Sequence, residues 1–172
     1  MTFPIGADLG SSTMGAWPVI VSSIINGIEL IKNPDIFITG HQSGFVRAEK
    51  NPFYQDSILS LNFIASVNPD AFVCSVNPAY TNKKVEQIVS IIKNIFQKEI
   101  LFFTLSKRKI EPKVDDRGSI YLTNELIDDQ EWHEIAAQLY DNYNIPVVDP
   151  LDNSHAGTIA DLIVNFFQEK TI

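Results

Sequence analysis

Apolar residues along this chain recur alternately at the spacing of a strand and at the spacing of a helix. Short runs rich in β-branched and aromatic residues alternate with longer segments in which apolar residues return every three or four positions. This alternation predicts a parallel sheet joined by right-handed crossover helices. We therefore expect an α/β fold of three layers, a mostly parallel sheet with helices on both faces, in one domain over residues 1–172.

The expected strands are short and end at turn residues. They span Phe3–Ala7, Asp35–Thr39, Ala71–Val76, Ile100–Leu105 and Ile145–Val148, with a further edge strand at Ser119–Thr123. The continuous apolar run of Ile100–Leu105 predicts a strand that is covered on both faces. In contrast, the charged segment Ser106–Gly118 contains Pro112 and predicts a mobile loop.

The expected helices carry apolar stripes at helical spacing. Their stripes run through 17–28, 56–67, 85–96, 132–140 and 159–166, and their expected N-caps are Thr81 or Asn82, Asp128 or Asp129, and Ser154. The segment Asp56–Val67 is apolar almost all round, which favours a helix buried against a sheet. Asn68-Pro69 should end it, because a residue before proline avoids the helical region.

Charge and cysteine content exclude several classes of function. The chain has 13 Lys and Arg against 21 Asp and Glu, a net charge of −8. Such a chain is poorly suited to nucleic acid or to an anionic membrane, because both are bound through Lys and Arg. A single cysteine cannot form an internal disulfide, so we expect the cytoplasm. The longest apolar stretch, Ala16–Ile25, is too short to span a bilayer.

The most informative loop lies between the first expected strand and the first helix. Gly10 and Gly15 have the spacing of a phosphate-binding loop, G-x-x-x-x-G-K-[ST], in which backbone amides and a helix N-terminus hold phosphates. Ala16 and Trp17 replace the Lys and the hydroxyl residue, so the loop is degenerate. A simple turn, a residual anion or nucleotide site, and triphosphate hydrolysis stay open. The candidate ligand residues here are Gly10, Ser11, Ser12, Thr13, Met14 and Gly15.

Other candidates follow later strands, at the sheet edge where α/β proteins bind ligands. The loop after Asp35–Thr39 provides His41, Gln42, Ser43 and Gly44, which suit either a close backbone approach to a ligand or a turn. Asn77 and Asp149 follow later strands, and each is interpreted as a ligand-binding residue or as a cap. The three histidines are scattered without ligand spacing, so no metal site is expected.

The remaining chemistry-bearing residues have mainly structural interpretations. Cys74 lies inside an expected strand, which indicates a small buried hydrophobic side chain. His133 is expected at a helix surface and His155 in a local cap. The run Lys107-Arg108-Lys109 is expected to be a solvated loop or a dock for an acidic partner.

Three motifs together resemble a P-loop-like superfamily, formerly of unknown function. They are Thr39-Gly40-His41-Gln42-Ser43-Gly44, Asn68-Pro69-Asp70-Ala71-Phe72-Val73 and Ile145-Pro146-Val147-Val148-Asp149-Pro150. The superfamily carries a G-Q-[ST]-G loop after the second strand, P-D-A before the third, and a terminal P-V-x-D-P. The resemblance implies a P-loop/Rossmann-like fold and runs from about Asp8 to Phe167.

The superfamily includes D-glutamate N-acetyltransferases that use acetyl-CoA and peptide maturation system proteins, encoded beside ribosomally made natural products such as bacteriocins. The G-x-Q-S-G loop and the Asp70–Asn77 run are closer to the second branch. Both branches usually carry a further N-terminal domain, so the chain is expected to be a short or C-terminal member. The resemblance implies an accessory protein that binds a peptide, a maturation enzyme or an anionic ligand without hydrolysis.

Two other functions stay open from the sequence. One is an enzyme of acyl or phosphoryl transfer, with a nucleotide or acetyl-CoA on Gly10–Gly15 and with Gln42 and Ser43 on the substrate. The other is a structural subunit of a homo-oligomer, which requires an exposed apolar patch that sequence does not reveal. Whether the chain is an enzyme is left undecided at this stage.

Overall fold

The computed structural model of the chain describes residues 17–40 and 56–169. Contacts divide the chain into two compact units, Met1–Pro69 and Asp70–Ile172, and each is described by itself. The expected strand Phe3–Ala7 lies outside the described residues. The expectation of one domain over residues 1–172 stays a prediction.

The first unit contains two helices, α1 (Trp17–Lys32) and α2 (Asp56–Val67), which contact each other. The Ser22 hydroxyl donates to the carbonyl of Ser66 at 3.0 Å and joins the two helices. Both helices end at an asparagine in the left-handed region, Asn33 (φ 41°) and Asn68 (φ 46°). The predicted bounds of α2 are confirmed, including its end before Pro69.

The prediction of a buried strand at Asp35–Thr39 is wrong. These residues form no strand, and the side chains of Ile36, Phe37 and Ile38 are 38%, 38% and 84% exposed. The run contains only three consecutive apolar residues. A strand of that length needs a neighbour to satisfy its backbone, and no described strand pairs with it.

The second unit is built on a parallel sheet of three strands in the order β1-β2-β5. The strands are β1 (Ala71–Val76), β2 (Glu99–Leu105) and β5 (Val147–Val148), close to their predicted positions. Phe102 and Phe103 are adjacent in β2 and are 2% and 0% exposed. Because adjacent side chains in a strand point to opposite faces, both faces of β2 are covered, as predicted.

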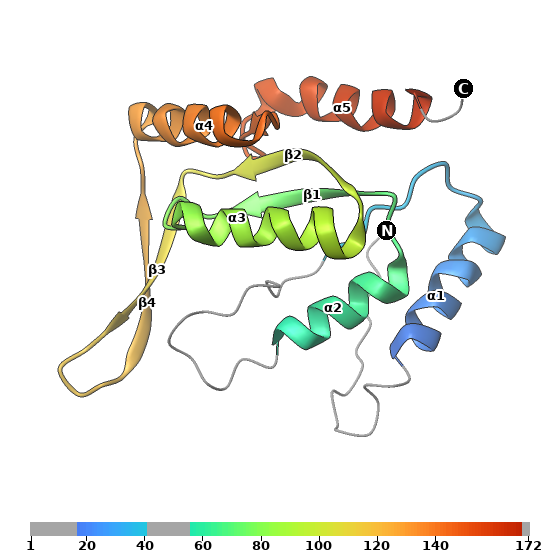
Figure 1. Cartoon of the computed structure of the whole chain (residues 1–172), viewed down its shortest axis with the longest axis horizontal. Coiled ribbons are helices and arrows are strands. Elements are labelled where there is room, and N and C mark those ends of the chain that lie inside the picture. The colour runs from blue at the N-terminus through green and yellow to red at the C-terminus, as the bar shows by residue number, and fades with distance from the viewer. Residues whose placement is uncertain (1–16, 41–55, 170–172) are drawn as a thin grey trace. The chain divides into compact units, whose positions relative to one another are not determined.

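Helices flank this sheet, with α3 on one side and α4 and α5 on the other (Figure 1). Thr81 caps α3 (Asn82–Ser90), which continues as the π-helical turn η1 (Ile91–Phe96). The buried stripe of α3 and η1 matches the predicted spacing and consists of Val85, Ile88, Val89 and Ile92. Phe96 of η1 packs against Phe72 of β1 with ring centroids 5.6 Å apart. The coarse α/β prediction is therefore confirmed.

The two C-terminal helices lie close to their predicted positions, but of the stripe expected at Ile159–Phe166 only Phe166 is buried. Asp128 caps α4 (Asp129–Tyr143), and Trp132, Ala136 and Leu139 form its buried stripe. Tyr140, expected in that stripe, is 50% exposed. A 3-10 turn, η2 (Asn153–His155), precedes α5 (Ala156–Glu169) and is capped by Asp152. Ser154, the expected cap of the last helix, lies inside this turn. Asp152 acts as the cap because its Oδ1 accepts a hydrogen bond from the amide of Ser154 at 2.8 Å.

The prediction of a loop at Ser106–Gly118 is wrong as well. The segment holds β3 (Arg108–Val114), which pairs antiparallel with β4 (Ile120–Leu126) and forms a hairpin that extends away from the three-stranded sheet (Figure 1). Its turn is closed by the Asp115 carboxylate, which accepts from the amides of Arg117 (2.9 Å) and Ser119 (2.7 Å). Gly118 adopts φ 79°, which favours glycine.

Candidate functional site

Most of the predicted ligand residues lie outside the described residues. These are Gly10, Ser11, Ser12, Thr13, Met14, Gly15, His41, Gln42, Ser43 and Gly44. Their grouping into one site stays a prediction. Asn77 and Asp149 are described, and both lie just beyond the carboxyl ends of parallel strands, β1 and β5.

Asn77 braces the hairpin with its side-chain amide. Its Nδ2 donates to the carbonyl of Ile110 at 3.1 Å, and its Oδ1 accepts from the amides of Ile110 (3.3 Å) and Ala79 (2.9 Å). The side chain therefore acts as a short strand segment on the outer edge of β3. This geometry matches the capping interpretation of Asn77.

We expect Asn77→Asp to lower the free energy of unfolding by about 1–3 kcal/mol. The new oxygen would face the Ile110 carbonyl, so a donor is lost and two acceptors oppose each other. Urea denaturation measures the loss, and amide exchange of Ile110 should accelerate. Asn165→Asp on the exposed surface of α5 is the matched control. Equal stability of the two variants would contradict the bracing role.

A buried indole anchors the carboxyl end of β2. Trp132 donates from Nε1 to the carbonyl of Leu105 at 2.7 Å, and its ring stacks against His155 with centroids 6.0 Å apart. Nδ1 of His155 accepts from the amide of Asp149 at 2.9 Å. The Asp149 carboxylate is buried and accepts from the amide of Leu151 at 2.9 Å. These polar groups hold the loop after β5.

Lys107 lies at the same edge in an acidic surrounding. Its Nζ is 2.6 Å from Oδ1 of Asp129, and this hydrogen bond raises the pKa of Lys107 and lowers the pKa of Asp129. Asp149 and Asp152 add attraction to the same ammonium group. The side chains of both partners are exposed, so the pair is screened by solvent. The positive charge of Lys107 is therefore balanced by these carboxylates, which makes Lys107 a poorer binding site for an acidic partner.

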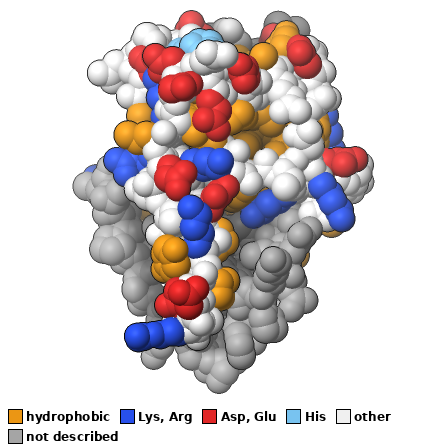
Figure 2. Space-filling model, turned by 90° about the vertical axis from the view of Figure 1, so that its left-hand side faces the viewer, with side chains coloured by type: hydrophobic (Ala, Val, Ile, Leu, Met, Phe, Trp, Pro, Cys, Tyr) orange, Lys and Arg blue, Asp and Glu red, His pale blue; other side chains and the backbone are white. Residues whose placement is uncertain are grey.

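The two faces of the hairpin differ sharply in polarity. One face carries charged and polar side chains, with Lys109 near Glu111 (3.6 Å) and Lys113 near Glu125 (3.2 Å). The opposite face is apolar and exposed, and Leu122 at its middle is 69% exposed. Figure 2 shows orange side chains beside charges of both signs on this side of the molecule. The apolar residues of this face are Ile110, Pro112, Val114, Ile120, Leu122 and Leu126. By the same register Arg108 and Asn124 lie on it as well.

The two edges of the hairpin also differ. The Asn77 amide occupies the outward N–H and C=O of Ile110, and Pro112 has no N–H, so the outer edge of β3 is blocked. On β4, Ser119 and Ile127 bond to the β3 side. By alternation, the backbone groups of Ile120, Leu122, Asn124 and Leu126 point outward. Within residues 17–40 and 56–169, no strand pairs with the outer edge of β4, so this edge is available for pairing.

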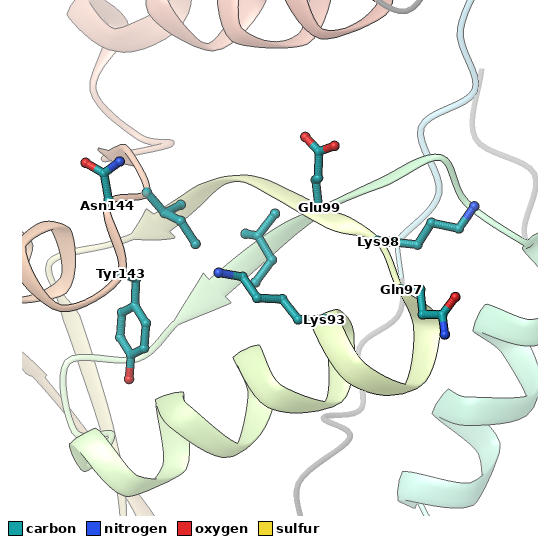
Figure 3. A pocket seen from close by; sticks show the side chains of 8 residues that line it. Lys93, Gln97, Lys98, Glu99, Tyr143 and Asn144 are labelled. Atoms are coloured by element: carbon teal, nitrogen blue, oxygen red, sulfur yellow. The ribbon is translucent and has the colours of Figure 1, made fainter.

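A shallow depression of about 560 Å³ lies at the opposite end of the sheet, beside the amino ends of β2 and β5. Figure 3 shows that its polar side chains diverge, with Lys98 and Gln97 pointing away from Tyr143 and Lys93. A small-molecule site needs polar groups that point toward the same ligand, so this depression is a poor candidate site.

The described residues provide little chemistry elsewhere. Burial raises the pKa of Cys74 to about 12, and Nδ1 of His133 contacts the carbonyl of Asp129 in its own helix at 2.6 Å. Within 17–40 and 56–169, no group of three or more His, Cys, Asp or Glu is placed to hold a metal ion. Among the helices of this part of the chain, none has the length and apolar character needed to cross a bilayer.

The described residues define a mixed α/β protein with a parallel sheet flanked by helices and a projecting amphipathic hairpin. No family model, curated protein or solved structure matches this chain. Where the hairpin lies, the sequence predicted a loop followed by a single edge strand at Ser119–Thr123, which overlaps β4. The signal was present as alternation of charged and apolar residues from Lys109 to Val114, a period of two.

Proposed function

We propose that this chain is an accessory protein of a modified-peptide maturation system, and that it binds an extended peptide without hydrolysing nucleotides. The observation that carries the proposal is the open outer edge of β4. An extended peptide can add as a third strand there, through main-chain hydrogen bonds. Its alternate side chains would extend the apolar face at Ile120, Leu122 and Leu126, which is partly exposed surface of the kind that marks interaction sites.

The sequence motifs support the same assignment. The loop Gly40–Gly44 and the segment Asp70–Asn77 resemble the peptide maturation branch of the P-loop-like superfamily. We include in the proposal a P-loop/Rossmann-like arrangement of the sheet, with a degenerate phosphate loop at Gly10–Gly15. The polar side chains beyond β1 and β5 are occupied by the protein's own backbone, which favours a binding role over catalysis there.

A fluorescein-labelled synthetic octapeptide of alternating Val and Lys tests the edge by fluorescence anisotropy. Its Lys side chains complement Glu125 and the net charge of −8. Leu122→Pro removes an outward N–H without touching the β3–β4 hydrogen bonds, so we expect it to weaken binding at least tenfold. The control Leu122→Ala keeps that N–H and should weaken binding less. Equal affinities for the wild type and Leu122→Pro would overturn the proposed edge site.

The alternative is an enzyme of acyl or phosphoryl transfer. It is favoured by one observation, that the first described residues after Gly10–Gly15 form the helix α1, because a helix follows the glycines of a phosphate-binding loop. Thermal-shift titrations with ATP, GTP and acetyl-CoA, each with and without Mg²⁺, distinguish it from the accessory protein. A rise in Tm that Gly15→Val abolishes would support the enzyme. No rise with any of them would leave peptide binding as the function.

A further inference from the structure

We infer that the apolar face of the β3–β4 hairpin docks against the same face of a second copy of this chain. The two hairpins would stack face to face and antiparallel around a twofold axis. This inference concerns the face of the hairpin rather than its edge, and it does not depend on the proposed peptide. The outer edge of β4 stays open in such a dimer.

The apolar face of the hairpin is largely exposed to solvent. An isolated two-stranded hairpin is only marginally stable in water, and this one presents an apolar side to solvent. Val114, Ile120, Leu122 and Leu126 are each more than 60% exposed. The other side carries ion pairs and is suited to solvent. Stacking two such hairpins about 10 Å apart would bury the apolar side of both at once, as in a small sandwich.

The two ends of the hairpin carry side chains of complementary charge. The strand register places Arg108 on the apolar face, at the base of the hairpin opposite Leu126. Arg108 is exposed and forms no ion pair with a described residue, while Asp116 is exposed at the tip. An antiparallel stack therefore brings the base of each hairpin to the tip of the other. One twofold axis would form the pair between Arg108 and Asp116 twice.

The distances along the strands allow this pairing. The paired segment is centred on Glu111 and Thr123. At about 3.3 Å per residue, Arg108 lies about 10 Å from that centre and Asp116 about 16 Å on the other side. The twofold axis therefore leaves about 6 Å between them along the strands, and with the two faces about 10 Å apart their Cα atoms are about 12 Å apart. The extended Arg and Asp side chains together span that distance. A single heterologous peptide has no reason to complement both ends in this way.

The size of the face sets the expected strength. Two strands of seven residues cover roughly 25 Å by 10 Å, which is about 250 Å² on each copy and about 500 Å² in total, below the area of a standard specific interface. We therefore expect a weak dimer that dissociates on dilution, with a dissociation constant of roughly 100 micromolar. The surface buried between the two hairpins would be mainly apolar at its centre and charged at its rim. This distribution is usual for protein–protein interfaces.

Sedimentation equilibrium of the full chain, from low to high micromolar concentration, tests the inference. We expect Leu122→Lys to abolish the dimer, whereas Tyr121→Lys on the charged face is the matched control and should leave it intact. Circular dichroism of each variant verifies that the fold survives. A monomeric wild type at high micromolar concentration, or a dimer that persists in Leu122→Lys, would overturn the inference.

A charge exchange tests the antiparallel arrangement. Arg108→Glu and Asp116→Arg should each weaken the dimer at least tenfold, because each places like charges together twice. The double variant, which combines the two substitutions, restores opposite charges. Its dimer dissociation constant should return to within about threefold of the wild-type value. A double variant as weak as either single variant would contradict the antiparallel stack.

Discussion

Replacement of Phe103 by alanine is expected to lower the free energy of unfolding by about 3–5 kcal/mol, much of the stability of an ordinary domain. Phe103 lies in the central strand of the sheet, beside Cys74 and Val147, and its side chain is fully buried. Its ring also meets Tyr143 edge to face at 5.8 Å. Truncation leaves a cavity that strands on both sides prevent from collapsing.

Urea denaturation followed by far-UV circular dichroism measures this loss. Leu151→Ala, at a position 70% exposed, is the control and should change the free energy by about 0.5 kcal/mol or less. Phe103→Leu keeps most of the apolar volume and should fall between them. If Phe103→Ala and Leu151→Ala had similar effects, the assignment of Phe103 to the centre of the core would be wrong.

Cys74 is expected to react with iodoacetamide about a thousandfold more slowly in the folded chain than in the unfolded chain. Burial in β1 raises the pKa of its thiol from the ordinary 9.0 to about 12. That difference corresponds to a thousandfold smaller thiolate fraction near neutral pH, since each pKa unit is tenfold. Mass spectrometry after timed alkylation, with and without urea, measures the ratio. Comparable rates in both conditions would show that Cys74 is accessible.

The same burial makes stability depend on alkaline pH. A pKa that is higher in the folded state means that folding favours the protonated thiol, so this stabilisation is complete below about pH 9. It is lost as the pH rises from 9 toward 12. Burial also raises the pKa of Tyr80, and Cys74 raises it further, so Tyr80 adds to the loss above pH 10. Cys74→Ala should flatten the profile between pH 9 and 10.

Helices were predicted well because their signal is local. The apolar stripe of α3 and the run of α2 each reveal a buried side within one segment, and caps such as Thr81 and Asp128 mark where helices begin. The central strand was equally clear, because a strand covered on both faces is continuously apolar. None of these assignments requires knowledge of a distant partner.

The failures have one cause, which is that a strand exists only if another strand pairs with it. Asp35–Thr39 has the composition of a buried strand, yet no described strand provides the pairing. Conversely, β3 looks like a charged loop with a proline. Pro112 is tolerated because its missing N–H lies on the outer edge, where it breaks no ladder hydrogen bond.

The candidate site shows the same division. Sequence spacing predicted that Asn77 and Asp149 would follow strands, and both do. Their roles depended on which backbone groups the fold brings near them. Asn77 meets Ile110, 33 positions away, and Asp149 meets Leu151 and His155. These contacts cannot be predicted from residue type and spacing alone, because they depend on the fold.

The amino-acid sequence by itself determined the α/β class, the positions of the helices and the central strand, because short-range periodicity and capping encode them. Long-range contacts in the folded chain place residues 108–126 in a projecting hairpin. Its β3 edge is blocked, its β4 edge is paired with no described strand, and one of its faces is apolar and exposed. The physical reason is that edges and faces of strands are defined by long-range hydrogen bonds. The brace between Asn77 and Ile110 is one of these, and it joins the end of β1 to the outer edge of β3.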